Sequence, residues 1–236
     1  MFCRAQIVPM PSDFNQLLSQ RRSIRAYKTD PVDRLVVERI CSAARRAPSG
    51  ANLQPGKFHV LSGTALDSLK TRLDKAQQDG TPIEQEYSYF PKVMSADLKD
   101  RQRRAGFALY EALGIAKRDV KGRREQFARN YRFFDAPVGI VVTIDRDMGK
   151  GCFMDLGMSL MTFLLAAENE GLGATGIGAL ANYGGVVHDH LHLPDDEMVV
   201  CGIAVGVADM SAEVNHFRTE RLALEEFSSF SGFERK

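Results

Sequence analysis

The stretch from Val138 to Glu170 decides the fold expected of this chain. Its first part, VGIVVTI at Val138–Ile144, is apolar on both faces, which is typical of a strand in the middle of a covered sheet. Its second part, CFMDLGMSLMTFLLAAENE at Cys152–Glu170, is apolar almost all round and predicts a central, buried helix that Gly171 caps. This stretch therefore forms the core of the predicted fold.

The elements expected on both sides of this stretch build a sheet covered by helices. Further strands are predicted at Lys57–Leu61 and Met198–Val205, and further helices around Phe14–Leu18, at Pro31–Ala44 and at Thr64–Gln78. This order indicates an α+β fold, with two long helices packing on a mixed sheet. No linker or repeat divides the 236 residues, so we expect a single domain over 1–236.

The segment 81–134 has a weaker pattern and a strong positive charge. Between Arg101 and Arg132 it holds ten Lys and Arg against three acidic residues. We interpret it as a helical lid over a substrate. The whole chain has a formal net charge of only +1, which argues against a nucleic-acid partner.

Cysteine usage and hydropathy indicate a reducing compartment. Cys3, Cys41, Cys152 and Cys201 are scattered without a CxxC pair, so neither a disulfide framework nor a zinc site is expected. Met1–Ser12 lacks the pattern of a secretory signal, and the longest mostly apolar run without charge is about half of the ~20 residues that a bilayer requires. We therefore expect a cytoplasmic protein with no membrane partner.

Arg21-Arg22-Ser23-Ile24-Arg25 is the strongest candidate for a binding site. Three guanidiniums and a hydroxyl follow a short helix, and the planar guanidinium binds phosphate oxygens two at a time. Arg218 and Arg221 supply two more guanidiniums, which close the far side of a phosphate site if the two segments meet. The alternative for each segment is ordinary surface charge.

Two further motifs invite interpretations that we reject. Gly171–Gly176 matches GxGxxG, but a long helix precedes it and a short strand follows, the reverse of a dinucleotide-binding fingerprint. We interpret its glycines as a helix cap that lets backbone approach a flat ligand. His188, His190 and His192 alternate, but no other ligand motif accompanies them, so solvent-facing histidines are expected rather than a metal site.

The turn Ser49–Pro55 lies between a predicted helix and a predicted strand. It is rich in backbone donors and carries the side-chain amides of Asn52 and Gln54, which can read the polar edge of a heteroaromatic ring. An ordinary capped turn explains it equally well.

Four segments in this order resemble the nitroreductase family of FMN-dependent oxidoreductases, over nearly the whole chain. They are RRSIR at Arg21–Arg25, APSGANLQP at Ala47–Pro55, FFDAPVGIVVTID with its following helix, and VNHFRTER at Val214–Arg221. The resemblance implies a nitroreductase-like α+β sandwich, with helices on both sides of the sheet. It also implies an obligate homodimer that holds FMN at its interface.

The resemblance also implies roles for individual residues. Arg21, Arg22 and Ser23 would contact the FMN phosphate and ribityl chain, and Arg221 and Arg218 would complete the contacts to the phosphate. Arg25 would lie at the pyrimidine edge, where a cation stabilises the charge left by reduction. The remaining cofactor contacts would be Pro48, Ser49, Gly50 and Asn52 across the dimer interface, and Gly176, Ile177 and Gly178 beside N5.

The activity that the resemblance implies is reduction of nitroaromatic or quinone-like acceptors by NAD(P)H. The mechanism would be ping-pong, with hydride transfer through the flavin and no catalytic side chain beyond the cofactor shell. Dehalogenating relatives place a Thr hydroxyl near N5, and Gly176-Ile177-Gly178 offers none, so reductive dehalogenation is the second possibility. A flavin-binding protein without turnover is the alternative from another class.

Aromatic residues in and beside the lid are the candidates for stacking on an acceptor ring: Tyr87, Tyr89, Phe90 and Phe134. The positive charge of the lid predicts either an anionic acceptor such as a nitrobenzoate or a preference for NADPH with its extra phosphate.

Overall fold

A four-stranded sheet forms the centre of the protein in a computed structural model that describes residues 14–233. The strand order is β1-β2-β4-β3, and every neighbouring pair is antiparallel. The strands are β1 Lys57–Ser62, β2 Val138–Asp145, β3 Gly173–Ile177 and β4 Glu197–Gly206. The VGIVVTI stretch forms β2, buried between two neighbours as predicted. The sequence predicts a mixed sheet, but the four strands are antiparallel, and the parallel pairing among the described residues is limited to isolated bridges such as that between Ser23 and Ala174.

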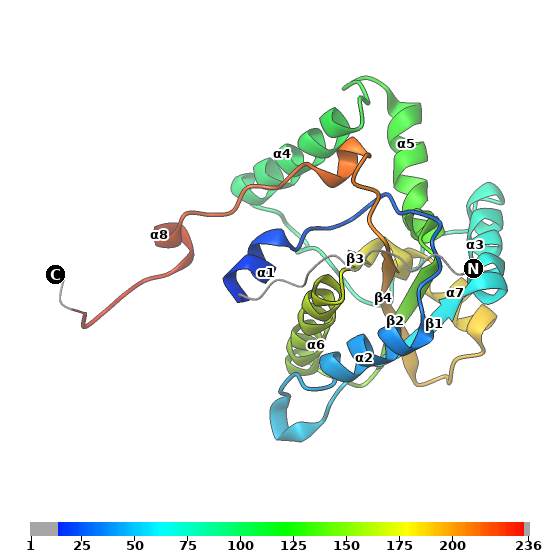
Figure 1. Cartoon of the computed structure of the whole chain (residues 1–236), viewed down its shortest axis with the longest axis horizontal. Helices are drawn as coiled ribbons and strands as arrows, with labels where there is room; N and C mark the ends of the chain where they lie inside the picture. The colour runs from blue at the N-terminus through cyan, green and yellow to red at the C-terminus, as the bar shows by residue number, and fades with distance from the viewer. Residues whose placement is uncertain (1–13, 234–236) are drawn as a thin grey trace, which may run out of the picture.

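Helices cover both faces of the sheet, which gives two hydrophobic cores (Figure 1). Helices α2 (Arg34–Ala44) and α6 (Lys150–Asn169) pack on one face. Helices α3 (Gly63–Gln78) and α7 (Gly184–Leu191) pack on the other, with the 3-10 segments η2 (Arg129–Asp135) and η3 (Gly178–Asn182). The predicted α+β sandwich is therefore confirmed.

Helix α2 begins later than the sequence predicts. The sequence predicts a start at Pro31, but the Asp33 side chain accepts a hydrogen bond from the Leu35 N–H at 2.8 Å and caps the helix, which begins at Arg34. An Asp at this position satisfies an N–H that the first helical turn leaves without a partner.

Helix α6 is not the buried helix that its sequence predicts. Only Leu156, Phe163 and Ala167 are buried, while Met154 is 72% exposed and Met158 and Met161 are also exposed. Its C-terminus does end as expected, because Gly171 has a φ of +75° and its N–H and that of Leu172 bond back to the last helical turn. One apolar face of α6 therefore has no partner within the described chain.

Helix α6 is also long and apolar enough, by length and composition alone, to cross a membrane, with a mean hydropathy of 1.3. Length and composition do not separate a membrane-spanning helix from a packed core helix, so this finding does not contradict the expectation of no membrane span. Leu156 and Phe163 nevertheless pack α6 onto the sheet, and Asp155 hydrogen-bonds to a loop of the same layer. The helix is thus part of a packed layer.

The basic segment 81–134 forms helices that stand away from the sheet, at the top of Figure 1. They are α4 (Ala96–Ala112), which has no buried residue, and α5 (Val120–Ala128). After η4 (Glu213–Asn215), the C-terminal segment runs beside α4 and then leaves the body through α8 (Leu224–Phe227). Its aromatic side chains Phe227, Phe230 and Phe233 are exposed. Cys3 and the N-terminal segment Met1–Ser12 lie outside the described residues.

Candidate functional site

The two arginine segments meet in a cavity of about 310 Å³, which we call the clamp cavity. Helix α1 (Phe14–Gln20) ends directly before Arg21, and the chain then runs beside β3 through the Ser23–Ala174 bridge. Arg218 donates to the Ser19 carbonyl and so ties the distant segment to the end of α1. The cavity is lined by Leu18, Ser19, Arg21, Arg22, Ser23, Arg25, Phe217, Arg218, Thr219 and Arg221.

Asn215 joins the two segments from inside the protein. It is fully buried, and its Oδ1 accepts the Arg25 backbone N–H at 2.8 Å. Its Nδ2 donates to the carbonyls of Ala26 and Asp209, both at 2.8 Å, while its own carbonyl accepts from Arg22 Nη1 at 3.0 Å. A lone Asn in a polar segment gave no signal of this role in the sequence.

The electrostatics of the clamp cavity favour an anion. The pKa of Arg21 is lowered, first by burial and then by the nearby charges of Arg221 and Arg218. Its Nε is buried and has no hydrogen-bond partner. Glu168 of α6 faces the same arginines, and burial raises its pKa against their attraction. Converging guanidiniums with a donor left over are a binding arrangement for phosphate oxygens.

The glycine-rich strand β3 lies beside the clamp cavity, because Ser23, which lines the cavity, bridges to Ala174 of β3. Gly173 is needed for packing, because a methyl group there would come 2.6 Å from Ile24 Cγ1. Gly176, in contrast, is exposed and would meet nothing within 4 Å. Beyond it, the Tyr89 ring covers Gly178, with Cε2 only 3.2 Å from where a Cβ would lie. The backbone at Gly176 is thus open to a ligand, while Tyr89 covers Gly178.

The turn Ser49–Gln54 has an unusual backbone. Ala51, Asn52 and Gln54 all have positive φ, at 49°, 57° and 49°. Such angles are strained for residues with side chains. Asp155 of α6 holds the turn, because its Oδ2 accepts the Gly50 N–H at 3.0 Å. The sequence did not single out Asp155.

The turn and the clamp cavity lie at opposite ends of α6. Asp155 contacts the turn, and Glu168 faces the clamp arginines. These residues are 13 positions apart, which is about 20 Å along a helix. One chain therefore does not bring Pro48, Ser49, Gly50 and Asn52 to its own clamp cavity.

The four aromatic candidates for substrate stacking differ in their surroundings. Tyr89 is 64% exposed, and Phe90 packs against it with ring centroids 5.0 Å apart. Tyr87 is half-buried against Phe153 and donates its hydroxyl to the Val200 carbonyl at 2.7 Å. Phe134 is 3% exposed and belongs to the core. Because Phe134 is buried, an acceptor cannot stack on its ring in this structure.

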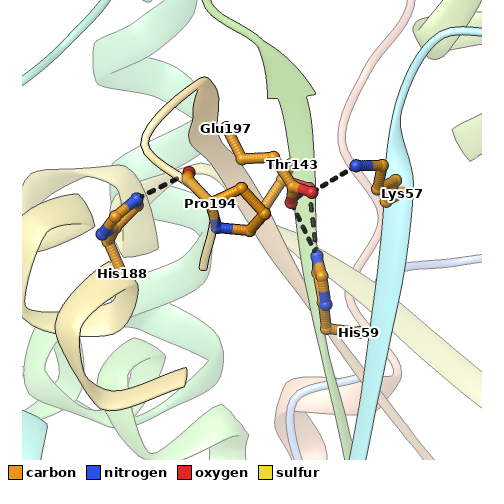
Figure 2. Close-up of polar contacts among 6 residues, drawn as sticks. All are labelled: Lys57, His59, Thr143, His188, Pro194 and Glu197. Carbon is orange, nitrogen blue, oxygen red and sulfur yellow. Dashed lines mark hydrogen bonds and ion pairs between the residues drawn. The ribbon is translucent and has the colours of Figure 1, made fainter. Parts of the chain in front are cut away.

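The histidine motif does not form a strand. His188 and His190 lie on α7, and His192 is its left-handed C-cap with a φ of 51°. His188 Nε2 lies 2.9 Å from the Pro194 carbonyl (Figure 2).

A different polar cluster, which the sequence did not predict, surrounds Glu197 at the start of β4. Glu197 is 2% exposed, and its carboxylate accepts from Thr143 at 2.7 Å and pairs with Lys57. His59 Nε2 lies 3.1 Å from it (Figure 2). Burial opposes ionisation of Glu197, but the hydrogen bonds from Lys57, Thr143 and His59 lower its pKa. The cluster ties β1, β2 and β4 together.

The fold is an antiparallel α+β sandwich, and its arginine clamp lies beside the glycine-rich strand β3. The nitroreductase family model matches residues 18–207, and the chain belongs to that family.

The chain is similar over nearly its whole length to proteins with named activities. It is 34% identical to a 4-nitrobenzoate reductase of Pseudomonas putida, covering 96% of this chain and 99% of that protein. It is 36% identical to a chloronitrobenzene nitroreductase of Comamonas testosteroni, covering 94% and 99%. Among solved structures, it matches the FMN and NADPH-dependent nitroreductase NfnB of Sphigopyxis sp. strain HMH with a TM-score of 0.90, 36% identity and coverage of 93% and 99%.

Proposed function

We propose that this protein is an FMN-dependent oxidoreductase that uses NAD(P)H to reduce nitroaromatic acceptors. The observation that carries the proposal is the convergence of Arg21, Arg22, Arg218 and Arg221 on one cavity, with Arg21 Nε buried and unpartnered. The named activities of the relatives, two nitroaromatic reductases and an FMN and NADPH-dependent nitroreductase, support it. Bound FMN would supply the redox chemistry, taking hydride from NAD(P)H and passing two electrons to the acceptor.

The residues around the clamp cavity fit FMN. The guanidiniums of Arg21, Arg22, Arg218 and Arg221 would hold its phosphate, and Ser23 its ribityl chain. Arg25 would lie at the pyrimidine edge. Burial lowers its pKa, but a guanidinium stays charged at neutral pH, so it provides a fixed positive charge there.

The ring end of the site would be built from β3 and the segment before α4. Gly176, Ile177 and Gly178 would pass beside N5 with their backbone, since Gly176 leaves open space. Tyr89, with Phe90 against it, would stack on the acceptor over Gly178. The helices of 81–134 would act as a lid within a single domain. No side chain is needed as a nucleophile, so the protein's task is positioning and electrostatics.

A homodimer would complete the site. The exposed apolar face of α6, with Met154, Met158 and Met161, is a surface that a second copy would bury. The turn carrying Pro48, Ser49, Gly50 and Asn52 lies about 20 Å from its own clamp cavity along α6, so it would reach a flavin only in the partner subunit. We therefore propose a homodimer with FMN between its subunits, and the cysteine usage of the chain favours the cytoplasm as its location.

The test is the visible spectrum of the purified protein before and after anaerobic addition of NADPH or NADH. A yellow protein that bleaches, and recovers its colour when a nitroarene is added, supports the proposal. A yellow protein that stays yellow with both nucleotides but bleaches with dithionite is the non-catalytic flavin-binding alternative. A colourless protein that takes up no added FMN overturns both.

The product distinguishes reductive dehalogenation from nitroreduction, because only dehalogenation releases halide. An enzyme reduced by NAD(P)H that releases halide from a halophenol faster than it consumes nitroarene would belong to the second possibility.

A further inference from the structure

A second cavity of about 600 Å³ lies beside the clamp cavity, and we call it the α4 cavity. Helix α4 forms one wall with Arg101 and Arg104, and the segment Arg218–Leu222 forms the other. Arg218, Thr219 and Arg221 line both cavities, so the two share a wall. The α4 cavity is about twice the size of the clamp cavity, within the range of pockets that bind small molecules.

The charge of the α4 cavity favours an anion. Arg101 and Arg104 line it on the α4 side, and Arg218 and Arg221 on the wall shared with the clamp cavity, against the two carboxylates of Glu220 and Glu226. The Glu226 carboxylate accepts the Ala223 N–H at 3.2 Å, which engages it within its own short helix. Glu220 is 82% exposed and lies 3.4 Å from Arg104. Exposed ion pairs are weak, so a doubly charged anion can displace Glu220 from Arg104.

The position of the α4 cavity limits what can occupy it. An acceptor must reach the proposed ring end of the flavin, at Gly176–Gly178 and Tyr89, and none of these residues lines the α4 cavity. The FMN phosphate is already assigned to the clamp cavity, where Arg21 and Arg22 face it together with the shared Arg218 and Arg221. NADPH, in contrast, is long: with its nicotinamide at the ring end, its adenosine must lie elsewhere, and it carries a 2′-phosphate there.

We propose that the α4 cavity binds the adenosine 2′-phosphate of NADPH, and that Arg101 and Arg104 make the protein prefer NADPH to NADH. The inference rests on the proposed function. Guanidiniums suit the task because they bind phosphate oxygens in pairs and remain charged. Arg104 pairs through Nε with Asp100 at 3.2 Å and through Nη1 with Glu220 at 3.4 Å, and only Glu220 lines the cavity, so the phosphate replaces Glu220 and this carboxylate opposes binding. The positive charge of the lid thus serves the reductant rather than the acceptor.

The first test is calorimetric titration of the FMN-loaded protein with adenosine 2′,5′-bisphosphate and with 5′-AMP. These probes differ only in the 2′-phosphate. We expect the bisphosphate to bind about tenfold or more tightly, since each charge-assisted contact contributes on that scale. The double variant Arg101→Ser/Arg104→Ser should abolish the difference, and Glu220→Gln should increase it. Equal binding of the two probes by the unaltered protein overturns the proposal.

Arg103 provides the matched control. It lies on the same helix and is exposed, but it does not line the α4 cavity. Arg103→Ser should therefore keep both the preference for the bisphosphate and the basal activity. A loss in Arg103→Ser as large as in the double variant would show that the helix acts only through its general charge, which contradicts a defined site.

The second test is the ratio of KM for NADPH to KM for NADH, which should rise about tenfold in the double variant. A rise instead in KM for 4-nitrobenzoate relative to nitrobenzene would place the acceptor in the cavity and overturn the proposal. If the protein shows no turnover at all, the proposed function fails, while the titration still decides whether the cavity binds a 2′-phosphate.

Discussion

The Oδ1 of Asn215 accepts the backbone N–H of Arg25 at 2.8 Å, across 190 residues of sequence. This bond, with the two that Asn215 Nδ2 donates, fixes the spacing between the two arginine segments of the clamp cavity. The side chain that positions the site is thus itself fully buried and cannot touch a ligand in it.

Replacing Asn215 with Ala should weaken both the fold and the clamp cavity. The change leaves the Arg25 N–H and the carbonyls of Ala26 and Asp209 without their partners, at about 1–3 kcal/mol for each buried group that stays unsatisfied. We expect a lower urea midpoint and faster FMN release on dilution. Glu213→Gln, an exposed change in the same segment, should alter neither. A stable variant that retains FMN would show that the clamp does not depend on this spacing.

Replacing Arg21 with Ala should weaken FMN binding without unfolding the protein. A charge-assisted phosphate contact is lost, typically about 1.5–3 kcal/mol for a bond to a charged group, which is roughly a tenfold to hundredfold rise in Kd. Quenching of FMN fluorescence measures it. Arg72→Ala on α3, exposed and outside the clamp cavity, is the control. Unchanged affinity in Arg21→Ala would mean that the clamp is misassigned.

Two tyrosines of the same segment should respond differently to substitution. Burial of the Tyr87 hydroxyl raises its pKa to about 12, and this hydroxyl donates to the Val200 carbonyl. Tyr87→Phe removes that hydrogen bond and should lower the free energy of unfolding by about 1 kcal/mol. Tyr89→Leu removes an exposed ring over Gly178 and should raise KM for a nitroarene with little change in stability. Thermal unfolding and steady-state kinetics on both variants separate the roles. The opposite pattern would exchange the assignments of the two residues.

The sequence predicts the strands well because burial on both faces of β2 and β4 requires a nearly unbroken apolar run. The sequence predicts the burial of α6 less well. Its apolar composition indicates a helix that avoids water, but composition does not show which of its faces packs against the sheet of the same chain. The aromatic residues near 81–134 look alike in sequence. Only the fold distinguishes Phe134, with a φ of 53° inside the core, from Tyr89 on the surface.

The parts of the site that the sequence misses depend on long-range contacts. Asn215 and Asp155 are ordinary polar residues in the sequence, and they become positioning groups only where the fold brings them to Arg25 and Gly50. The meeting of Arg21 with Arg218 and Arg221 likewise depends on tertiary structure. The sequence indicates each arginine segment as a candidate phosphate site, but it does not show that the two segments lie side by side.

Asp155→Ala should release the turn Ser49–Gln54. Three residues in the turn have positive φ, which is a strained backbone conformation. Without Asp155, the Gly50 N–H loses its acceptor, and the hydrogen bond that stabilises this conformation is lost. We expect weaker FMN retention and a changed visible circular dichroism of the flavin. Asp155→Asn keeps an acceptor oxygen and should restore both signals. Asp147→Ala, exposed and outside the turn, is the control. A full loss in Asp155→Asn would indicate that the charge matters rather than the hydrogen bond.

Glu197 should make stability depend on acidic pH. Burial opposes its ionisation, but the hydrogen bonds from Lys57, Thr143 and His59 lower its pKa in the folded state. The unfolded state therefore takes up a proton more readily, and the stabilisation is present above the unfolded pKa of about 4.3 and is lost as the pH falls through the lower folded value. Glu197→Gln should lower the free energy of unfolding at pH 7 by about 1–3 kcal/mol.

The pH dependence of that difference tests the mechanism. Urea unfolding of the original protein and Glu197→Gln at several pH values between 7 and 3.5 should give a gap that narrows below about pH 4.5, because only the carboxylate loses its advantage on protonation. Asp195→Asn, an exposed change two residues before Glu197, should leave the slope unaltered. A gap that stays constant across the range would assign the effect to side-chain packing, since a packing defect does not titrate.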